Sequence, residues 1–180
     1  MASLSSRSGN TAPVTLVLGG ARSGKSRFAE SLLSDATQRI YLATAEARDD
    51  EMRRRIRDHQ ARRGQDWHTI EAPLDIATPI AQAGRDAVLV DCLTLWLSNL
   101  MAAHLSIEEA TAGLCQALGK VQAPVVLVSN EVGLGIVPDN ALAREFRDHA
   151  GRLNQTIAAA AARVYFIAAG LPLTLKDNAA

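Results

Sequence analysis

The sequence predicts a single-domain, doubly wound α/β fold, with a mostly parallel sheet that carries helices on both faces. Short apolar runs alternate with helical patterns, which is typical of parallel βαβ units. These runs are apolar on successive residues, so helices are expected to cover both faces of the sheet. A glycine-rich segment, Gly19–Ser26, separates the first run from the first helical pattern. A length of 180 residues suits one domain.

The expected strands are the short apolar runs, and the last of them forms a terminal hairpin arm. They cover residues 14–18, 39–44, 67–70, 87–91, 124–129, 164–168 and 171–175. The expected helices lie near residues 26–33, 49–63, 74–82, 93–103, 107–118 and 139–162. The second helix opens with acidic residues and fills its later turns with arginines, and Gly64 can end it. Asp139 or Asn140 can cap the last helix.

The first dozen residues are rich in Ser, Gly and Ala. We expect residues 1–12 to form a disordered extension, which leaves residues 13–180 as the nucleotide-binding domain. No apolar stretch approaches the roughly 20 residues that a membrane span needs. Stable membrane insertion is therefore not expected.

Composition narrows the class of partner. Lys plus Arg equals Asp plus Glu at 19 each, and the resulting net charge of zero argues against bulk binding to nucleic acid. Hydrophobic residues make up 48% and charged residues 21%, which allows both a core and solubility. Cys92 and Cys115 form no CxxC pair, so we expect two reduced thiols in a cytoplasmic protein.

The glycine-rich segment matches the phosphate-loop pattern G-x-x-x-x-G-K-[ST] without a mismatch, between an expected strand and an expected helix. Backbone N–H groups of such a loop point at phosphate oxygens. Lys25 is expected to neutralise β/γ-phosphate charge as a catalytic residue, and Ser26 to ligate Mg²⁺. The alternative is a plain turn with a chance match. The nucleotide-binding residues predicted here are Gly19, Gly20, Ala21, Arg22, Ser23, Gly24, Lys25 and Ser26.

Asp91 ends a hydrophobic run, at the edge where open α/β sheets bind ligands. We expect it to be the second metal ligand, although an Asp at this place is often only a turn former. The residues after Asp91 and the Ser129–Val132 segment lack the sequence patterns of a switch GTPase.

The helix expected over residues 49–63 places His59 on a partly apolar face beside Arg62 and Arg63. A neutral imidazole can attack phosphorus and hold the transferred group before a second acceptor takes it. From spacing alone, a structural or merely exposed histidine is the commoner case. His68 competes for the role, but it lies in an expected strand without basic neighbours. The other two histidines are interpreted as helix-surface residues: His104 and His149.

Several motifs, spread over nearly the whole chain after residue 13, point in combination to one family of enzymes. They are residues 19–27 with 29–30, 41–44, 50–52 with 55–56 and His59, then Trp67, Thr69 and Glu71, 129–138, and Arg144, Arg147, Gly151, Arg152, Asn154 and Gln155. Together these motifs resemble the bifunctional adenosylcobinamide kinase/adenosylcobinamide-phosphate guanylyltransferases of cobalamin biosynthesis. The strings GGARSGKS and NEVGLGIVP are far more specific in combination than a phosphate loop alone.

The resemblance implies a RecA-like phosphate-loop fold, commonly a homotrimer, that uses Mg²⁺ with GTP and ATP as substrates. It implies phosphorylation of the corrinoid adenosylcobinamide, followed by transfer of GMP from GTP through a histidine to give adenosylcobinamide-GDP. His59 matches the guanylylated histidine. The residues that match guanine-nucleotide contacts are Thr44, Ala45, Glu46, Gln60, Ala61, Arg62, Arg63, Glu71 and Asp91.

Two alternatives remain open at this point. A RecA-like nucleic-acid-dependent ATPase would use the arginines of residues 49–63 as a binding surface, although few aromatics are present for stacking. A plain small-molecule kinase would lack the nucleotidyl step. The Asn130-Glu131 pair and the glycines after it predict either a ligand-approaching lid or a plain connection. Arg144 and Arg147 are expected to pair with Glu145 and Asp148, or else to meet phosphate or corrinoid amides.

Overall fold

The computed structural model describes residues 14–45 and 66–178, and a seven-stranded sheet organises them. The strands are β1 (Val14–Gly19), β2 (Arg39–Ala43), β3 (Trp67–Glu71), β4 (Ala87–Asp91), β5 (Val125–Asn130), β6 (Arg163–Ala168) and β7 (Leu171–Asp177). Their order is β3-β2-β4-β5-β1-β6-β7. All neighbours pair in parallel except β6 and β7, which form an antiparallel hairpin. The mostly parallel sheet and its terminal arm confirm the sequence prediction.

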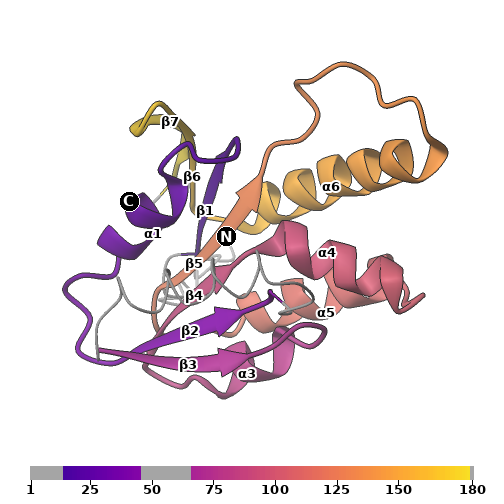
Figure 1. Cartoon of the computed structure of the whole chain (residues 1–180). Helices are drawn as coiled ribbons and strands as arrows, with labels where there is room; N and C mark the ends of the chain where they lie inside the picture. The colour runs from indigo at the N-terminus through magenta and orange to yellow at the C-terminus, as the bar shows by residue number, and fades with distance from the viewer. Residues whose placement is uncertain (1–13, 46–65, 179–180) are drawn as a thin grey trace, which may run out of the picture.

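Helices cover both faces of this sheet, as expected for a doubly wound fold. They are α1 (Lys25–Ser31), α3 (Ala77–Gln82), α4 (Leu93–Ala102), α5 (Ile107–Leu118) and α6 (Ala141–Ala160). Figure 1 shows α4, α5 and α6 on one side of the sheet and α1 on the other. The strand order therefore places β1, which precedes the glycine-rich segment, near the middle of a covered sheet.

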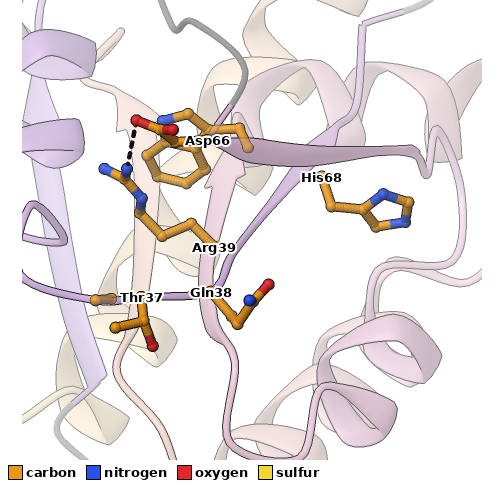
Figure 2. Close-up of a pocket in the computed structure, with 7 residues that line it drawn as sticks. Thr37, Gln38, Arg39, Asp66 and His68 are labelled. Atoms are coloured by element: carbon orange, nitrogen blue, oxygen red, sulfur yellow. Dashed lines mark ion pairs between the residues drawn. The ribbon is translucent and has the colours of Figure 1, made fainter.

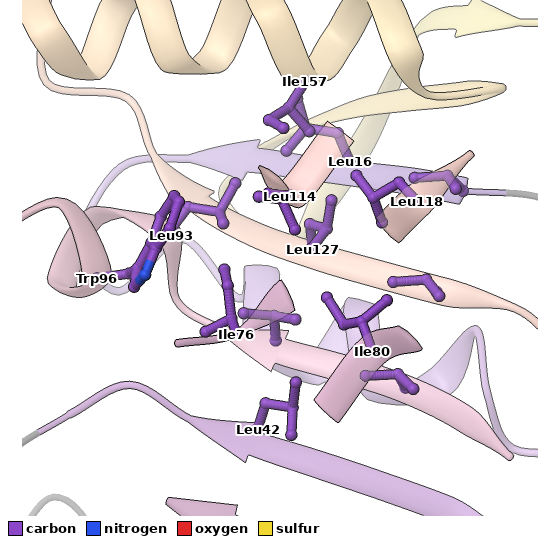
Figure 3. Packing of buried hydrophobic residues seen from close by; sticks show 14 of the residues in the cluster. Leu16, Leu42, Ile76, Ile80, Leu93, Trp96, Leu114, Leu118, Leu127 and Ile157 are labelled. Atoms are coloured by element: carbon purple, nitrogen blue, oxygen red, sulfur yellow. The ribbon is translucent and has the colours of Figure 1, made fainter. Parts of the chain in front are cut away.

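Two apolar clusters hold the layers together, one on each face of the sheet. In the larger one, Leu16 and Leu127 of the sheet pack with Trp96 and Ile157 of the helices (Figure 3). The smaller cluster joins alternate strand residues such as Val17, Leu89 and Val128 to Ala29 of α1 and to Leu33, which follows that helix. Full burial of one such large side chain stabilises the fold by roughly 1.5–3 kcal/mol. Alternation along each strand thus decides which helix layer a side chain meets.

Helix starts use the residues that the sequence favours. Asn140 caps α6, because its side-chain oxygen accepts a 2.7 Å hydrogen bond from the backbone N–H of Ala143. Ser106 does the same for α5, accepting from Glu109 N at 3.2 Å. Of the two caps proposed from the sequence for the last helix, Asn140 is the one observed.

Two expectations lie outside the described residues: the extension over 1–12 and the helix over 49–63. Among the helices of the described ranges, none combines the length and apolar character needed to cross a bilayer.

Candidate functional site

The phosphate loop follows β1 at the carboxyl edge of the sheet, and its glycines are required at both ends. A Cβ on Gly19 would lie 2.6 Å from Ser23 Oγ and 2.7 Å from the carbonyl oxygen of Ile167. Gly24, immediately before α1, has φ of 96°, a left-handed conformation that side chains rarely adopt. Glycine is therefore required at these two positions for steric reasons, since a phosphate loop must turn tightly for its N–H groups to point at a phosphate.

A turn at the far end of the sequence braces the same loop. The β6–β7 hairpin reverses at Ala169 and Gly170, which both have positive φ, at 52° and 80°. The N–H of Gly170 donates a 2.8 Å hydrogen bond to the carbonyl oxygen of Ser23. The loop is thereby fixed from outside its own helix.

Lys25 and Ser23 fit a phosphate ligand. The Lys25 ammonium is half-buried and donates to the carbonyl oxygen of Gly20 at 3.1 Å. Burial lowers the pKa of Lys25, and the nearby Cys92 and Asp91 act against that shift. In the part of the chain that the structure describes, the buried Ser23 hydroxyl has no hydrogen-bond partner. Phosphate oxygens would give both groups acceptors.

Asp91 ends β4, and Tyr41 of β2 donates a 3.0 Å hydrogen bond to its Oδ2. Together with Ser26 near the start of α1, it offers the oxygen donors that Mg²⁺ prefers. No group of three or more His, Cys, Asp or Glu side chains suited to a metal occurs within the described ranges.

Thr44 has a structural use in this arrangement. It is fully buried, its hydroxyl donates to the Cys92 carbonyl oxygen at 2.8 Å, and the Cys92 N–H donates back to it at 2.7 Å. Asn99 of α4 donates to the carbonyl oxygen of Thr44 at 2.8 Å. The hydroxyl therefore holds the chain that follows Asp91 in place.

The remaining residues of the predicted guanine-nucleotide set are only partly described. Register places Ala43 opposite both Glu71 and Asp91, so the two carboxylates are at the carboxyl ends of the strands on either side of β2. Glu71 is exposed, and Ala45 is half-buried. The residues that lie outside the described ranges are Glu46, His59, Gln60, Ala61, Arg62 and Arg63. Their roles stay predictions.

The other histidines lie away from the phosphate loop or have helix neighbours. His68 is the second residue of β3, exposed at the amino-terminal edge of the sheet, whereas the loop is at the carboxyl edge. His149 of α6 lies 3.8 Å from Glu145 and contacts Arg152. His104 is exposed just after α4. His68 is thus poorly placed to compete for the nucleophile role.

A depression of about 600 Å³ also lies at that amino-terminal edge (Figure 2). Arg39 pairs with Asp66 at 3.1 Å there and lies over the Trp67 ring, 5.1 Å from its centroid. These residues begin β2 and β3 or precede them, whereas the phosphate loop follows the end of β1. The depression is therefore separate from the predicted nucleotide site.

Sequence reasoning missed a buried polar network between β5 and two helices. Ser129 donates to Asn154 Oδ1 at 2.7 Å and contacts the Thr94 hydroxyl at 3.3 Å. The N–H of Asn130 donates to Thr94 Oγ1 at 2.7 Å, and Asn154 Nδ2 donates to the Asn130 carbonyl oxygen at 3.3 Å. The sequence signal for this network was one polar residue at a core position in each of three elements, namely Thr94 in α4, Ser129 in β5 and Asn154 in α6.

The expected arginine pairs are half right. Arg147 pairs with Asp148 at 3.0 Å. Arg144 instead donates to the carbonyl oxygens of Pro138 and Asp139, at 2.9 and 2.7 Å, and so anchors the end of the β5–α6 loop. Arg144 therefore hydrogen-bonds to backbone carbonyl oxygens that precede α6, and the expected pair with Glu145 is not observed in the described part of the chain.

A comparison with protein families decides the class of this site. The sequence model of the family described as cobinamide kinase/cobinamide phosphate guanyltransferase matches residues 15–175 of this chain. The chain belongs to this family. It is therefore an adenosylcobinamide kinase and adenosylcobinamide-phosphate guanylyltransferase, an enzyme of cobalamin biosynthesis.

Curated relatives agree over most of their length. The bifunctional adenosylcobalamin biosynthesis protein CobP of Pseudomonas aeruginosa is 48% identical over 169 residues, which cover 91% of this chain and 97% of that protein. CobU of Salmonella typhimurium, with the same description, is 43% identical over 178 residues, covering 89% and 98%. The resemblance drawn from the motifs is confirmed.

Solved structures of low sequence identity support the fold alone. A type III secretion ATPase shares 11% identity at a TM-score of 0.56. The match covers 90% of this chain and 56% of that protein, a little over half its length. A Pyrococcus horikoshii OT3 protein shares 10% identity at a TM-score of 0.52, covering 92% and 86%. The RecA-like phosphate-loop fold is confirmed.

Proposed function

We propose that this family member carries out two reactions in sequence at the carboxyl edge of its sheet. It phosphorylates the aminopropanol hydroxyl of adenosylcobinamide with ATP or GTP. It then transfers GMP from GTP, through His59, to the phosphorylated corrinoid, giving adenosylcobinamide-GDP and pyrophosphate. The observation that carries the proposal is the loop itself, where the buried Ser23 hydroxyl has no hydrogen-bond partner among the described residues and the Lys25 ammonium lies against the loop backbone at Gly20.

In the kinase step the protein contributes positioning and charge. The acceptor hydroxyl oxygen bonds to the γ-phosphorus, and its proton passes to solvent. The bond to the bridging oxygen breaks, and the nucleoside diphosphate leaves with that electron pair. Lys25 offsets the charge on the β- and γ-phosphates, and loop N–H groups hold their oxygens. Ser26 and Asp91 would hold Mg²⁺, which neutralises phosphate charge when bound.

In the nucleotidyl step a ring nitrogen of His59 bonds to the α-phosphorus of GTP, and pyrophosphate leaves. A phosphate oxygen of the phosphorylated corrinoid then bonds to the same phosphorus, and the imidazole leaves unchanged. The sequence resemblance over residues 50–59 and the family's guanyltransferase description support this role. Thr44, Glu71 and the residues after His59 complete the proposed guanine-nucleotide site.

Labelling with GTP that carries a labelled α-phosphate tests the covalent step. The protein should retain label that is lost in acid and kept in alkali, as a phosphoramidate is. His59→Asn should retain none, whereas His68→Asn, at the opposite edge of the sheet, serves as the matched control and should label normally. An unlabelled wild type, or a labelled His59→Asn variant, would refute the histidine intermediate.

Lys25→Ala tests the loop separately from the histidine. The variant should bind GTP and ATP at least about tenfold more weakly, because it loses a charge next to the phosphates. Equilibrium dialysis with each nucleotide measures this, and unaltered affinity would contradict the loop assignment. A wild type that phosphorylates cobinamide but never forms the GDP derivative would point to the plain kinase alternative.

The proposal includes a homotrimer in the cytoplasm, as the family resemblance implies. Light scattering of the purified protein checks the subunit count. A monomer that carries out both reactions would separate the activity from this assembly.

A further inference from the structure

The strand between the phosphate loop and Asp91 ends in a side chain that the proposed reaction has not yet used. β5 lies between β1 and β4 in the sheet. Its last residue, Asn130, is opposite Gly19, the first residue of the loop. Asp91 is opposite Val128, two residues earlier, so Asn130 lies just beyond the level of that carboxylate.

Alternation along β5 gives the side of the sheet on which Asn130 lies. Val128 belongs to the apolar cluster that contains Ala29 of α1. Ser129 contacts Asn154 of α6 on the opposite side. The next side chain, Asn130, is therefore on the α1 side, which is the side of the phosphate loop.

The Lys25 ammonium defines where phosphates would lie relative to this side chain. It donates a 3.1 Å hydrogen bond to the carbonyl oxygen of Gly20, so it lies against the loop that follows β1. The end of β5 lies between that loop, at the end of β1, and Asp91, at the end of β4. Among the described residues, the half-buried Asn130 carboxamide has no hydrogen-bond partner, while its backbone N–H and carbonyl are both engaged.

We propose that the Asn130 carboxamide donates a hydrogen bond to the γ-phosphoryl group during phosphoryl transfer, and that Thr94, Ser129 and Asn154 position it. The inference rests on the proposed kinase reaction in the same loop. The acceptor hydroxyl oxygen bonds to the γ-phosphorus, the bridging bond breaks toward the nucleoside diphosphate, and the hydroxyl proton passes to solvent. Asn130 stays chemically unchanged and stabilises the oxygens whose charge is redistributed.

The buried network gives this donor a fixed place. Thr94 of α4 accepts a hydrogen bond from the Asn130 N–H, and Asn154 of α6 donates one to its carbonyl oxygen. Two helices therefore fix the peptide groups on both sides of Asn130. Ser129 ties Thr94 and Asn154 to each other. Thr94, Ser129 and Asn154 are almost fully buried, which makes each of these hydrogen bonds costly to break. Thr94, Ser129 and Asn154 are thus positioning residues, and of these four residues only Asn130 touches the reacting group.

Asn130→Ala should separate the two reactions of the enzyme. Turnover in the kinase step should fall about 10²-fold, as for loss of one preorganised donor, with the nucleotide KM changed less than about threefold. Guanylylation of the protein by GTP, in which the bond changes occur at the α-phosphorus, should stay within about tenfold of wild type. Asn178→Ala, which truncates an exposed carboxamide after β7, is the matched control and should leave both rates unaltered.

A second pair of variants tests the positioning role without relying on Asn130. Thr94→Val keeps the side-chain shape but removes the acceptor for the Asn130 N–H, and should lower kinase turnover about tenfold. Thr94→Ser keeps the hydroxyl and should retain turnover near wild type. Thermal unfolding of every variant identifies any loss of fold.

The outcomes separate the inference from the function on which it rests. Normal kinase turnover in a folded Asn130→Ala variant would overturn the inference alone. Equal losses in both reactions would also overturn it, as would Thr94→Ser behaving like Thr94→Val. A wild type that transfers no phosphoryl group to cobinamide would refute the proposed function and this inference together.

Discussion

The Tyr41 hydroxyl donates a 3.0 Å hydrogen bond to Oδ2 of Asp91, across a separation of 50 residues in the sequence. The contact joins neighbouring strands, and the Tyr41 ring packs edge-on against Trp67 at a centroid distance of 6.0 Å. One carboxylate oxygen of Asp91 is thereby oriented by a rigid aromatic side chain. Asp91 is the last residue of β4, at the carboxyl edge of the sheet, where we propose that it helps to hold Mg²⁺.

Tyr41→Phe should lower the affinity of the enzyme for Mg²⁺ while preserving the fold. The ring contact with Trp67 remains, but Asp91 loses the donor that orients it, a hydrogen bond worth about 1.5–3 kcal/mol at a charged group. The Mg²⁺ concentration for half-maximal kinase activity should rise about three- to tenfold. Tyr165→Phe removes the only other tyrosine hydroxyl, away from Asp91, and should leave this concentration unaltered.

Gly19→Ala should damage the phosphate loop through steric overlap. The new Cβ would meet the Ile167 carbonyl oxygen, which belongs to the sheet backbone and cannot move aside easily. We expect the free energy of unfolding in urea to fall by about 1–3 kcal/mol. Gly20→Ala, where a Cβ has nothing within 4 Å, should stay within about 0.5 kcal/mol of wild type. Equal unfolding free energies for the two variants would contradict the overlap.

The loop between β5 and α6 should determine the affinity for the corrinoid. It rises clear of the sheet (Figure 1). It starts next to the phosphate loop, where the N–H of Glu131 donates to the carbonyl oxygen of Gly19 at 3.1 Å, and within it Ile136 is 98% and Leu134 81% exposed. Large exposed apolar side chains beside a reaction site suit a large organic acceptor. Ile136→Ser should raise the KM for cobinamide about tenfold and leave the nucleotide KM unaltered. Leu105→Ser, a similar change after α4, is the control, and a matching rise there would argue against a specific contact.

Asp75 should make stability depend on pH at the acid end. Its Oδ1 accepts a 3.0 Å hydrogen bond from the backbone N–H of Thr78, which lowers the pKa of Asp75 below its usual 3.8. A lowered folded-state pKa contributes stability above the unfolded value, and this is lost as pH falls through the folded value. Asp75→Ala should cost about 1 kcal/mol of unfolding free energy at pH 7 and progressively less below pH 3.8.

The control for that prediction is Asp35→Ala, which removes an exposed aspartate outside any helix start. Urea unfolding of both variants and of wild type is compared over the same series of pH values. A constant difference for Asp75→Ala over the same range would show that the Thr78 contact contributes nothing to the pH dependence.

Much of the fold could be predicted because the determining signals are local. Runs such as Val125–Val128 are apolar on both faces, and a phosphate loop is contiguous in sequence, so neither requires knowledge of strand order. The cap at Asn140 is local in the same sense. Helix α3 begins at Ala77, later than the helix expected near residues 74–82, because Asp75 forms a turn with Thr78 first.

The candidate site was harder to predict because its support is non-local. The Tyr41–Asp91 hydrogen bond depends on β2 lying next to β4, which nothing in the spacing of the two residues reveals. The Thr94–Ser129–Asn154 network requires three elements to meet around one peptide group. Thr44 was predicted to bind nucleotide from resemblance, and the structure shows that its hydroxyl holds Cys92. His59 lies outside the described residues, so its role stays a prediction.

The hydrogen bond from Gly170 to Ser23 ties the timing of loop formation to the last hairpin of the fold. A glycine-rich turn near the start of the chain gains its final shape only when β6 and β7 have paired. Contacts of such long sequence separation are slow to form. During refolding, the ability to bind a triphosphate should therefore arise late, together with protection of hairpin amides from hydrogen exchange. A half-folded molecule would hold nucleotide poorly even with most of its helices in place.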